Sequence, residues 1–399
     1  MNATTTGTGG LRRPTVTIVT PSYNQGHFIR ATIESVLAQD YPHLEYIIMD
    51  GGSTDETAAI VAEYGSRLKW ISEKDRGQSH AINKGFSMAG GEIVAWLNSD
   101  DILLPSAVAR AVKAFGEAPP RVGGIYGEGR LMDREGRITG RFPATEPFNL
   151  WKLVYLSDYI LQQSTFFRRE AVAEVGWLDE SLHYTMDWDL LIRLGERFGL
   201  HYVPQYFGVL REYPEAKTFA GGGERIEEIR RVLERHTGLR RAPGYWTYGL
   251  ETLRSEWKDR LGNRSPAWLR PGAKLAAFII RHATAVPLML IHRHCQGMYP
   301  DRWASDRLRW MLPEAAIEAV IRGDSQIADQ TLSVSAKGRK LGAWKVGRGA
   351  FTLCFDVPPG SQGAFQFEVR ASRYKRPRLG SELSLRRMAW MVEAVEWTA

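Results

Sequence analysis

The sequence predicts an α/β protein with a mainly parallel central sheet, followed by a helical segment and a small C-terminal antiparallel β module. In the first 115 residues, short apolar runs alternate with segments of helical periodicity, which is the pattern of parallel strands joined by helices. From Ile327 onward, apolar and polar residues alternate with a period of two, as in strands buried on one face. The length of 399 residues exceeds the usual size of a single core.

The parallel sheet begins with the β-branched run Val16–Thr20, which Pro21 is expected to end because proline lacks the N–H that a sheet requires. The spacing of Ser53 and Glu56 matches a capping box that opens a helix over 55–64. The other elements expected here are helices over 27–39 and 78–88 and strands at 46–49, 68–72 and 93–97. This β-α-β-α-β-α-β order predicts a parallel sheet covered by helices.

The strand at 93–97 leads directly into the polar run NSDD at 98–101. Its continuous apolarity is typical of a strand buried on both faces. In open α/β sheets ligands bind at the carboxyl ends of strands, so two acids at this point indicate a metal ion or a polar ligand. The alternative is that Asp100 or Asp101 caps a helix that begins near Pro105.

Polar side chains also follow the other strands, with Tyr23 and Asn24 after the first, Asp50 after the second and Asp75 after the third. An aromatic ring can stack on a nucleotide base, and a carboxylate can accept hydrogen bonds from the base or ribose. A further acid can hold Mg or Mn against a diphosphate. Ordinary turn chemistry is the alternative. The absence of G-x-x-x-x-G-K-[ST] and G-x-G-x-x-G motifs disfavours P-loop and dinucleotide-binding folds.

These motifs, in this order, resemble family 2 glycosyltransferases with the GT-A nucleotide-sugar fold. The resemblance rests on TPSYNQGHFIRATIESVLAQDYPHLEYIIMDGGSTDET, SEKDRGQSHAINKG and LNSDD. It is close from Thr15 to about Phe115 and looser to about Tyr213. It implies a nucleotide-sugar donor and a divalent metal cofactor, Mg or Mn. The donor-binding positions that it implies are Thr20, Pro21, Tyr23, Asp50, Asp75, Asn98 and Ser99, and the metal-binding position is Asp100.

The later segment LQQSTFFRREAVAEVGWLDESLHYTMDWDLLIRLG resembles the part of the family in which an acid pair opens a helix. This resemblance makes Asp187 the catalytic base. Leu190, Leu191 and Leu194 form an apolar stripe on a helix that begins near Asp187, so its carboxylate is expected in the first turn. The alternative is an acid that only stabilises the positive end of the helix.

The sequence departs from the family pattern at three places. The pair DG stands at 50–51 where the family often has DDGS, and NSD stands at 98–100 where it has DxD. Met186 replaces the first acid of the later pair. Because the asparagine of NSD offers an amide oxygen without a charge, a metal ion would depend on Asp100, the donor phosphates and water.

The second half of the chain carries the positive charge. Residues 223–312 hold 17 Lys and Arg against 9 Asp and Glu and account for the net charge of +7. Helices are expected over 224–236, 246–261 and 268–294, after a hinge or mobile loop at Gly221–Gly223. The apolar part of the last helix is too short and interrupted to span a membrane. Basic residues beside apolar ones predict peripheral contact with an anionic membrane, and a solvated helical face is the alternative.

The C-terminal module is expected to be a small β-sandwich. Phe351, Leu353, Phe355 and Val357 fall on one face of a strand, and Phe365, Phe367 and Val369 repeat the pattern. Sugar binding, self-association and stabilisation are all open as its role. The predicted organisation is a tail at 1–13, a GT-A domain at 14–220, the basic helical segment at 221–312 and the β module at 313–399.

The predicted location is cytoplasmic, at the inner face of the membrane. Cys295 and Cys354 form no disulfide framework or zinc pattern, and the first 14 residues contain no apolar run of the kind found in signal peptides. No helix-turn-helix, zinc-finger or RNP-like motif accompanies the basic residues, so nucleic acid is not an expected partner.

The sequence and the resemblance together predict an inverting glycosyltransferase of cell-surface polysaccharide biosynthesis. It would transfer a sugar from a UDP- or dTDP-sugar to a hydroxyl of a glycan or lipid-linked acceptor. One alternative is a sugar-nucleotide pyrophosphorylase, but the loop SYNQG lacks the basic, glycine-rich character that such an enzyme needs. The other is a non-catalytic glycan-binding or scaffold protein with a decayed donor pocket, which the NSD motif and Met186 favour.

Overall fold

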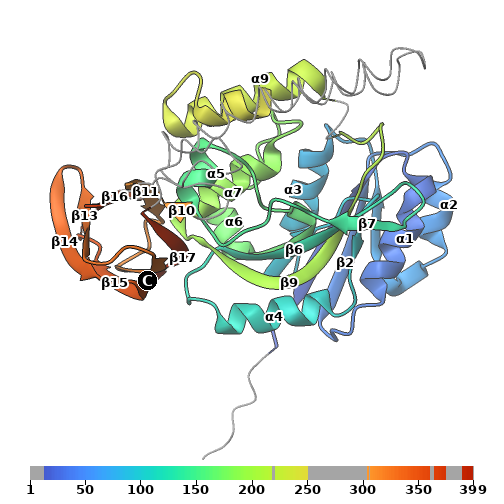
Figure 1. Cartoon of the computed structure of the whole chain (residues 1–399). Coiled ribbons are helices and arrows are strands. Elements are labelled where there is room, and N and C mark those ends of the chain that lie inside the picture. Colours follow the sequence, from blue (N-terminus) through green and yellow to red (C-terminus); the bar gives the residue numbers. More distant parts are fainter. Residues whose placement is uncertain are drawn as a thin grey trace, which may run out of the picture.

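A mixed nine-stranded sheet forms the centre of the protein (Figure 1). The structure is a computed structural model, and it describes residues 13–217, 221–249, 303–304, 306–359, 364–373 and 389–398. The strand order is β3-β2-β1-β4-β8-β6-β9-β5, with β7 paired to β6. The strands are β1 (Val16–Ser22), β2 (Leu44–Asp50), β3 (Lys69–Ser72), β4 (Ile93–Trp96), β5 (Ile102–Leu103), β6 (Gly124–Met132), β7 (Ile138–Arg141), β8 (Thr165–Arg168) and β9 (Leu200–Arg211).

Helices cover both faces of this sheet, as the alternation of elements predicts. The helices are α1 (Gly26–Leu37), α2 (Thr57–Ala62), α3 (Gln78–Met88), α4 (Ala107–Glu117), α5 (Leu150–Tyr155), α6 (Arg169–Val175), α7 (Met186–Arg197) and α9 (Gly222–Thr237), with 3₁₀ turns at Gly65–Arg67 and Gln162–Ser164. Side chains of α1, α2 and α4 share one apolar core, and those of α3, α5, α6, α7 and α9 share the other. Residues of β1 alternate between them, because Ile18 joins the first core and Val19 the second.

The four strands of the N-terminal half are parallel, and their carboxyl ends meet at one edge. In the register of the sheet, Ser22 of β1 lies opposite Asp50 of β2, and Val19 lies opposite Trp96 of β4. The antiparallel strand β8 then joins β4, and β6 and β9 follow. The predicted α/β class is therefore confirmed, with a sheet that is mixed beyond β4.

Two local predictions about the first turns are wrong. Pro21 lies inside β1, opposite Met49, at a point beyond the part of β1 that pairs with β4. Its missing N–H therefore removes no hydrogen bond between β1 and β4. The capping box is also absent, since α2 begins at Thr57 without a side-chain cap. Ser53 instead donates its hydroxyl to the Asp50 carboxylate.

Two predictions about the later chain also need correction. Gly222 and Gly223 are not a hinge, because they form the first turn of α9. The segment 221–312 is not helical throughout, since β10 (Trp303–Ala304) and β11 (Arg307–Leu312) pair with strands of the C-terminal module. The helix predicted over 268–294, most of that over 246–261, and Cys295 lie outside the described residues. In the parts of the chain that the structure describes, no helix is long and apolar enough to cross a bilayer.

The C-terminal module consists of two antiparallel sheets with the orders β10-β17-β12-β15 and β11-β16-β13-β14. The remaining strands are β12 (Glu318–Ser325), β13 (Gln330–Ala336), β14 (Arg339–Val346), β15 (Gly349–Asp356), β16 (Phe365–Ala371) and β17 (Trp390–Thr398). The predicted inward face of β15 is confirmed, because Leu353 and Phe355 are buried while Cys354 is exposed. Both sheets contribute to one core, as in a sandwich.

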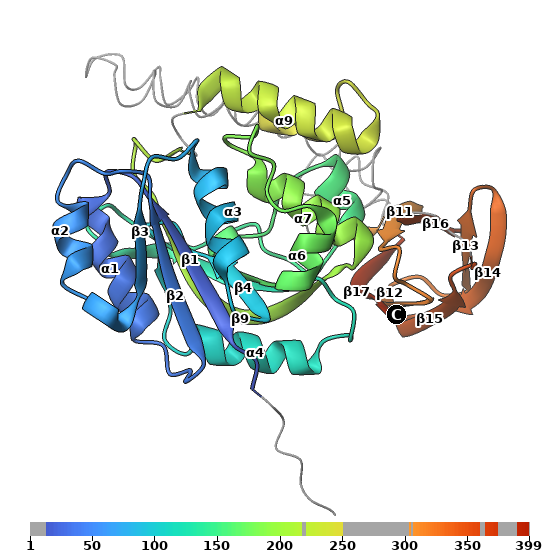
Figure 2. The same ribbon diagram turned by 180° about the vertical axis from the view of Figure 1, so that it is seen from behind.

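This module packs against α5 and the end of α7 rather than against the carboxyl ends of the parallel strands (Figure 2). Arg197 at the end of α7 forms an ion pair with Glu314 (3.0 Å). The rings of Phe148 and Trp397 lie 5.6 Å apart. The module therefore contacts the rest of the chain near α5 and at the end of α7.

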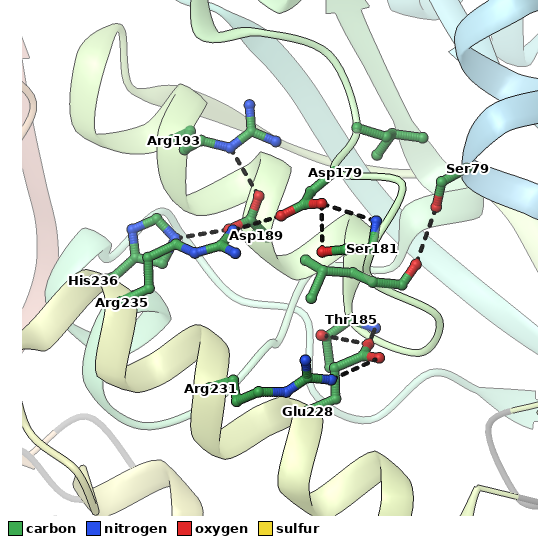
Figure 3. A network of polar contacts seen from close by, with 12 residues as sticks. Ser79, Asp179, Ser181, Thr185, Asp189, Arg193, Glu228, Arg231, Arg235 and His236 are labelled. Carbon is green, nitrogen blue, oxygen red and sulfur yellow. Dashed lines mark hydrogen bonds and ion pairs between the residues drawn. The ribbon is translucent and has the colours of Figure 1, made fainter.

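A buried charge network joins α7 to α9 (Figure 3). The Asp189 carboxylate is fully buried and accepts hydrogen bonds from Arg193 Nε (2.8 Å) and Arg235 (3.0 Å). It also lies 3.0 Å from His236 Nε2. Burial opposes ionisation, but the hydrogen bond from His236 and the charge of Arg193 outweigh it and lower the pKa of Asp189 to about 2. The network holds α9 against the helix that carries Asp187.

We expect Asp189→Asn to lower the free energy of unfolding by about 3 kcal/mol, because it removes the carboxylate that balances the largely buried Arg193. Urea denaturation measures the loss. Asp179→Asn is the matched control, since Asp179 contacts the same Arg235 from a more exposed position and should cost below about 1 kcal/mol. In the wild type, the contribution of Asp189 is present above pH 3.8 and is lost as the pH falls through about 2. Equal losses in the two variants would contradict this role.

Candidate functional site

A cavity of about 790 Å³ opens at the carboxyl edge of the sheet, between the strand ends and α7. It collects residues from segments that are far apart in the sequence. Among the predicted site residues, those that line it are Pro21, Tyr23, Asp75, Asn98, Ser99, Asp100 and Asp187. The structure therefore brings the predicted donor, metal and base positions into one site.

Thr20 and Asp50 do not line this cavity, although both are predicted donor-binding residues. Thr20 is fully buried, with its hydroxyl 3.0 Å from that of Tyr46. The Asp50 carboxylate accepts hydrogen bonds from the backbone N–H of Ser53 (3.1 Å) and the hydroxyl of Ser72 (2.5 Å). Its oxygens are engaged within the protein, so Asp50 shapes the turn beside the cavity.

The rim of the cavity presents an exposed aromatic ring. Tyr23 is 61% exposed, which is unusual for so large a side chain. Asn24 holds the loop at a positive φ of 52° and accepts a hydrogen bond from the backbone of Thr54 (2.8 Å). The space beside this ring is narrow, because a Cβ at Gly51 would lie 2.8 Å from Asp75 Oδ2 and 3.3 Å from Tyr23 Cδ2. Tyr23 and Asp75 thus form one wall, with a flat ring available for stacking.

The two acids of the NSDD turn have different surroundings. Asp101 is buried, and its carboxylate accepts hydrogen bonds from the Arg211 N–H (2.8 Å), Gln163 Nε2 (2.6 Å) and Asn98 Nδ2 (3.1 Å). Burial, and next the charge of Asp100, raise the pKa of Asp101 well above its usual value. Asp101 is therefore a structural residue, and neither acid caps α4, which begins at Ala107 after β5.

Asp100 faces the cavity and accepts a hydrogen bond from the Tyr213 hydroxyl (2.7 Å). Burial raises the pKa of Asp100, while Tyr213 and the charge of Arg211 oppose the rise. Ionising Asp100 in this buried position costs free energy, and a bound cation would stabilise the ionised form. Asp100 is thus the acid of the turn that is placed to meet a ligand.

The amide of Asn98 is hydrogen-bonded within the protein at both its oxygen and its nitrogen. Its Oδ1 accepts a hydrogen bond from Gln78 Nε2 (2.7 Å), and its Nδ2 donates to Asp101. No group of three or more Asp, Glu, His or Cys side chains suited to a metal ion occurs in the described part of the chain. Mg and Mn are often held by one or two carboxylates together with substrate phosphates and water. Asp100 fits such a site, with the donor completing the coordination.

Asp187 lies in the first turn of α7, as predicted, and lines the other side of the cavity. Burial raises the pKa of Asp187, against the hydrogen bond from the Trp188 N–H (2.8 Å) and the charges of Lys217 and Arg225. Asp158 lines the same wall. Burial, and next the charge of Asp187, raise the pKa of Asp158 well above its usual value. The charge of Asp187 therefore disfavours a second negative charge on Asp158.

Met186, which replaces an acid in the family pattern, is a core residue here. It is buried, belongs to the core around α7, and its sulfur accepts a hydrogen bond from the Ser79 hydroxyl (3.0 Å). Its side chain thus ties the start of α7 to α3. This departure has a packing reason.

Helix α9 holds the turn that precedes Asp187 (Figure 3). The Glu228 carboxylate accepts hydrogen bonds from the backbone N–H groups of His183 (2.8 Å), Tyr184 (2.6 Å) and Thr185 (2.7 Å), and from the Thr185 hydroxyl (2.8 Å). Burial opposes ionisation, but these donors outweigh it and lower the pKa of Glu228. Glu228 therefore fixes the backbone from which α7 starts.

The sequence reasoning missed four residues of this site, namely Gln78, Asp158, Lys217 and Glu228. Lys217 donates a hydrogen bond from Nζ to Gln78 Oε1 (2.8 Å). Gln78 and Lys217 could have been found from their positions in the sequence, because Gln78 begins a predicted helix and Lys217 follows a strand end. Asp158 and Glu228 carry no local pattern that separates them from other acids of the chain.

A family model described as glycosyl transferase family 2 matches residues 17–176. An uncharacterized glycosyltransferase of Mycobacterium tuberculosis is 34% identical over 185 residues, covering 45% of this chain and 68% of the relative. One from Rickettsia bellii is 30% identical over 188 residues, which cover 45% of this chain and 27% of the relative. The O-antigen biosynthesis protein RfbC of Myxococcus xanthus is 31% identical over 193 residues, covering 46% of this chain and 15% of that protein.

The chain thus spans about a quarter of the length of the R. bellii relative and less of RfbC. Among solved structures, a Pyrobaculum calidifontis mannosyltransferase in complex with GDP-Man and Mn²⁺ gives a TM-score of 0.45 at 23% identity, covering 71% of this chain and 83% of that one. S. aureus TarS 1–349 in complex with UDP-GlcNAc gives 0.43 at 16% identity, covering 72% and 93%. Scores below 0.5 support no functional statement about this chain.

The mixed sheet gathers the motif-bearing turns at one edge. The family model covers β1 to α6, and the M. tuberculosis relative shares 34% identity over more than two thirds of its own length. The chain belongs to glycosyl transferase family 2, with a GT-A-like domain followed by a C-terminal antiparallel β module.

Proposed function

We propose that the chain transfers a sugar from a nucleotide-sugar donor to a hydroxyl group of a glycan or glycolipid, with inversion at the anomeric carbon. The observation that carries this proposal is the presence of Asp100, Asp187 and the exposed ring of Tyr23 around one cavity. A metal-binding acid, a base and a stacking surface are the groups that such a transfer requires.

The donor would lie along the strand ends. Tyr23 offers its ring to the base, and Asp75 offers carboxylate oxygen to polar groups of the nucleoside. Asp100 would hold a divalent ion against the diphosphate, and that ion would offset the negative charge of the leaving group. Asp101 takes no part in binding, because its oxygens already hold Arg211 and Gln163. A UDP- or dTDP-sugar is the proposed donor, on the resemblance of the sequence motifs.

Asp187 would act as the general base. The oxygen of the acceptor hydroxyl attacks the anomeric carbon, its proton passes to the Asp187 carboxylate, and the bond to the diphosphate breaks with its electron pair. Burial favours this role because it raises the pKa of Asp187, and so its basicity. Displacement from the face opposite the leaving group inverts the anomeric centre.

The acceptor is proposed to belong to a cell-surface polysaccharide, in line with the name of the O-antigen biosynthesis relative. A lipid-linked acceptor at the inner face of the membrane, and a cytoplasmic location, are proposals that rest on the basic segment. Most of that segment lies outside the described residues. Flotation with anionic vesicles at low and high salt is its test, since screening weakens such binding.

Two other functions are less well supported. The loop after β1 presents Tyr23, Asn24 and Gln25, without the basic residues of a pyrophosphorylase. A decayed, non-catalytic site was favoured by Asn98 and Met186. Both have structural reasons here, because Asn98 bonds Gln78 and Asp101 while Met186 packs in the core.

We expect Asp187→Asn to lower kcat by roughly two to four orders of magnitude, the usual contribution of a general base. Donor affinity should change little. In the wild type, kcat/KM should fall as the pH drops through the raised pKa of Asp187, because protonation removes the base. A radiolabelled sugar-transfer assay over a pH series measures both effects. Asp324→Asn, in β12 of the distant module, is the control. A variant that keeps more than about a tenth of the wild-type rate excludes Asp187 as the base.

A second variant, Asp100→Asn, should remove most of the metal-dependent binding of a nucleoside diphosphate, because the turn then offers no charged ligand. Calorimetry with UDP, with and without Mn²⁺, measures the difference. The melting temperature should be kept, since Asp101 bonds the turn to Gln163 and Arg211, and an amide oxygen at position 100 can still accept the hydrogen bond from Tyr213. Mn²⁺-dependent affinity equal to that of the wild type would rule out Asp100 as the metal ligand.

A further inference from the structure

We propose that Lys217 supplies a positive charge for the donor diphosphate, in addition to the metal ion that Asp100 would hold. The ligand class is a nucleoside diphosphate, either as part of the donor or as the leaving product. This inference rests on the proposed function and adds a residue that lies beyond the family match, which ends at residue 176.

The position of Lys217 links it to the NSDD turn. It follows β9 in sequence and lines the same cavity as Asp100 and Asp187. Its Nζ donates to Gln78 Oε1 (2.8 Å), and Gln78 Nε2 donates to Asn98 Oδ1 (2.7 Å). The ammonium group is therefore held one side chain away from the asparagine that precedes Asp100.

The link through Gln78 also bears on the difference between the NSD motif of this chain and the DxD motif of the family, which has two acids. An acid at position 98 would bring a negative charge that a metal ion could neutralise. Asn98 brings none, and its amide is already committed to Gln78 and Asp101. A lysine at the same wall adds positive charge without a metal ligand, which compensates for a metal that depends on one carboxylate.

The charge of Lys217 is only partly balanced inside the protein. Burial lowers the pKa of Lys217 to about 8, although Asp187 on α7 and Glu228 on α9 favour its charged form. His183, in the turn before α7, faces the same group, and burial followed by the charge of Lys217 lowers its pKa. Among the described residues no carboxylate lies within ion-pair distance of Lys217 Nζ. An anionic ligand in the cavity would supply the missing counter-charge.

A purely structural lysine is the competing explanation. Glu228 is occupied by backbone N–H groups, and Asp187 by the Trp188 N–H, so neither holds Lys217 directly. The hydrogen bond to Gln78 uses one of the three donors of an ammonium group. A structural role would be filled as well by a neutral donor, whereas charge neutralisation requires a cation.

Calorimetric titration with UDP, in EDTA and in Mn²⁺, tests the proposal on the full chain. Lys217→Met should weaken binding in EDTA by about tenfold or more, because charge pairs across an interface are commonly worth at least this much. Lys217→Arg should keep most of the affinity, while Lys217→Gln should behave like Lys217→Met. Lys113→Met is the matched control, since Lys113 lies on α4 and is largely exposed. Circular dichroism and thermal unfolding report whether each variant is folded.

Proton uptake distinguishes charge from structure. Near pH 8 the wild type should take up protons when UDP binds, because a diphosphate raises the pKa of Lys217 from about 8. Titrations in buffers of different ionisation enthalpy measure this uptake, which Lys217→Met should reduce. Unchanged affinity and unchanged proton uptake in Lys217→Met would overturn the inference while leaving the proposed function intact. A wild-type protein that binds no UDP in either medium would overturn both.

Discussion

The buried carboxylate of Asp101 is the contact on which the geometry of the site depends. It joins three segments, because it accepts hydrogen bonds from Asn98 in its own turn, from Gln163 before β8 and from the backbone of Arg211 at the end of β9. These bonds close the sheet around the end of β4. Both acids line the cavity, but the Asp101 carboxylate is occupied by these three donors, whereas the Asp100 carboxylate accepts one hydrogen bond, from Tyr213.

A similar division of labour governs the opposite wall. Glu228 gathers three successive backbone N–H groups at the start of α7, and Asp189 ties the same helix to α9. Asp187, which lies between these anchors, faces the cavity. Carboxylates that receive several donors thus build the site, and those that receive few are left to meet a ligand. The surroundings, rather than the residue type, decide which role each acid has.

The sequence predicted the parallel half of the fold well, because its signals are local. Apolar periodicity placed α3 at Gln78–Met88 and placed β4 to within one residue. The failures have physical causes of other kinds. Pro21 is tolerated in β1 because the neighbouring strand has ended, and Gly222 begins a helix because α9 packs on α7. Periodicity does not register such tertiary context.

The same limit applies to the site. Strand-end position pointed to Tyr23, Asp75 and Asp100, and the family resemblance pointed to Asp187. The structure brings all four around one cavity. Strand-end position could not separate Asp100 from Asp101, because the partner Arg211 lies 110 residues further along the chain. Thr20 and Asp50 satisfied the motif but are engaged internally, and Glu228 acts across more than 40 residues. Roles set by long-range hydrogen bonds require the folded chain.

The position of a bound nucleoside diphosphate tests the central claim most directly. A crystal structure of the full chain with UDP and Mn²⁺, with the metal located by its anomeric signal, would provide it. We expect the metal at Asp100, the diphosphate between Asp100 and Lys217, the base against Tyr23, and Asp187 facing the space left for the sugar. A nucleotide bound outside this cavity, or one whose diphosphate points away from Asp100, would contradict the account.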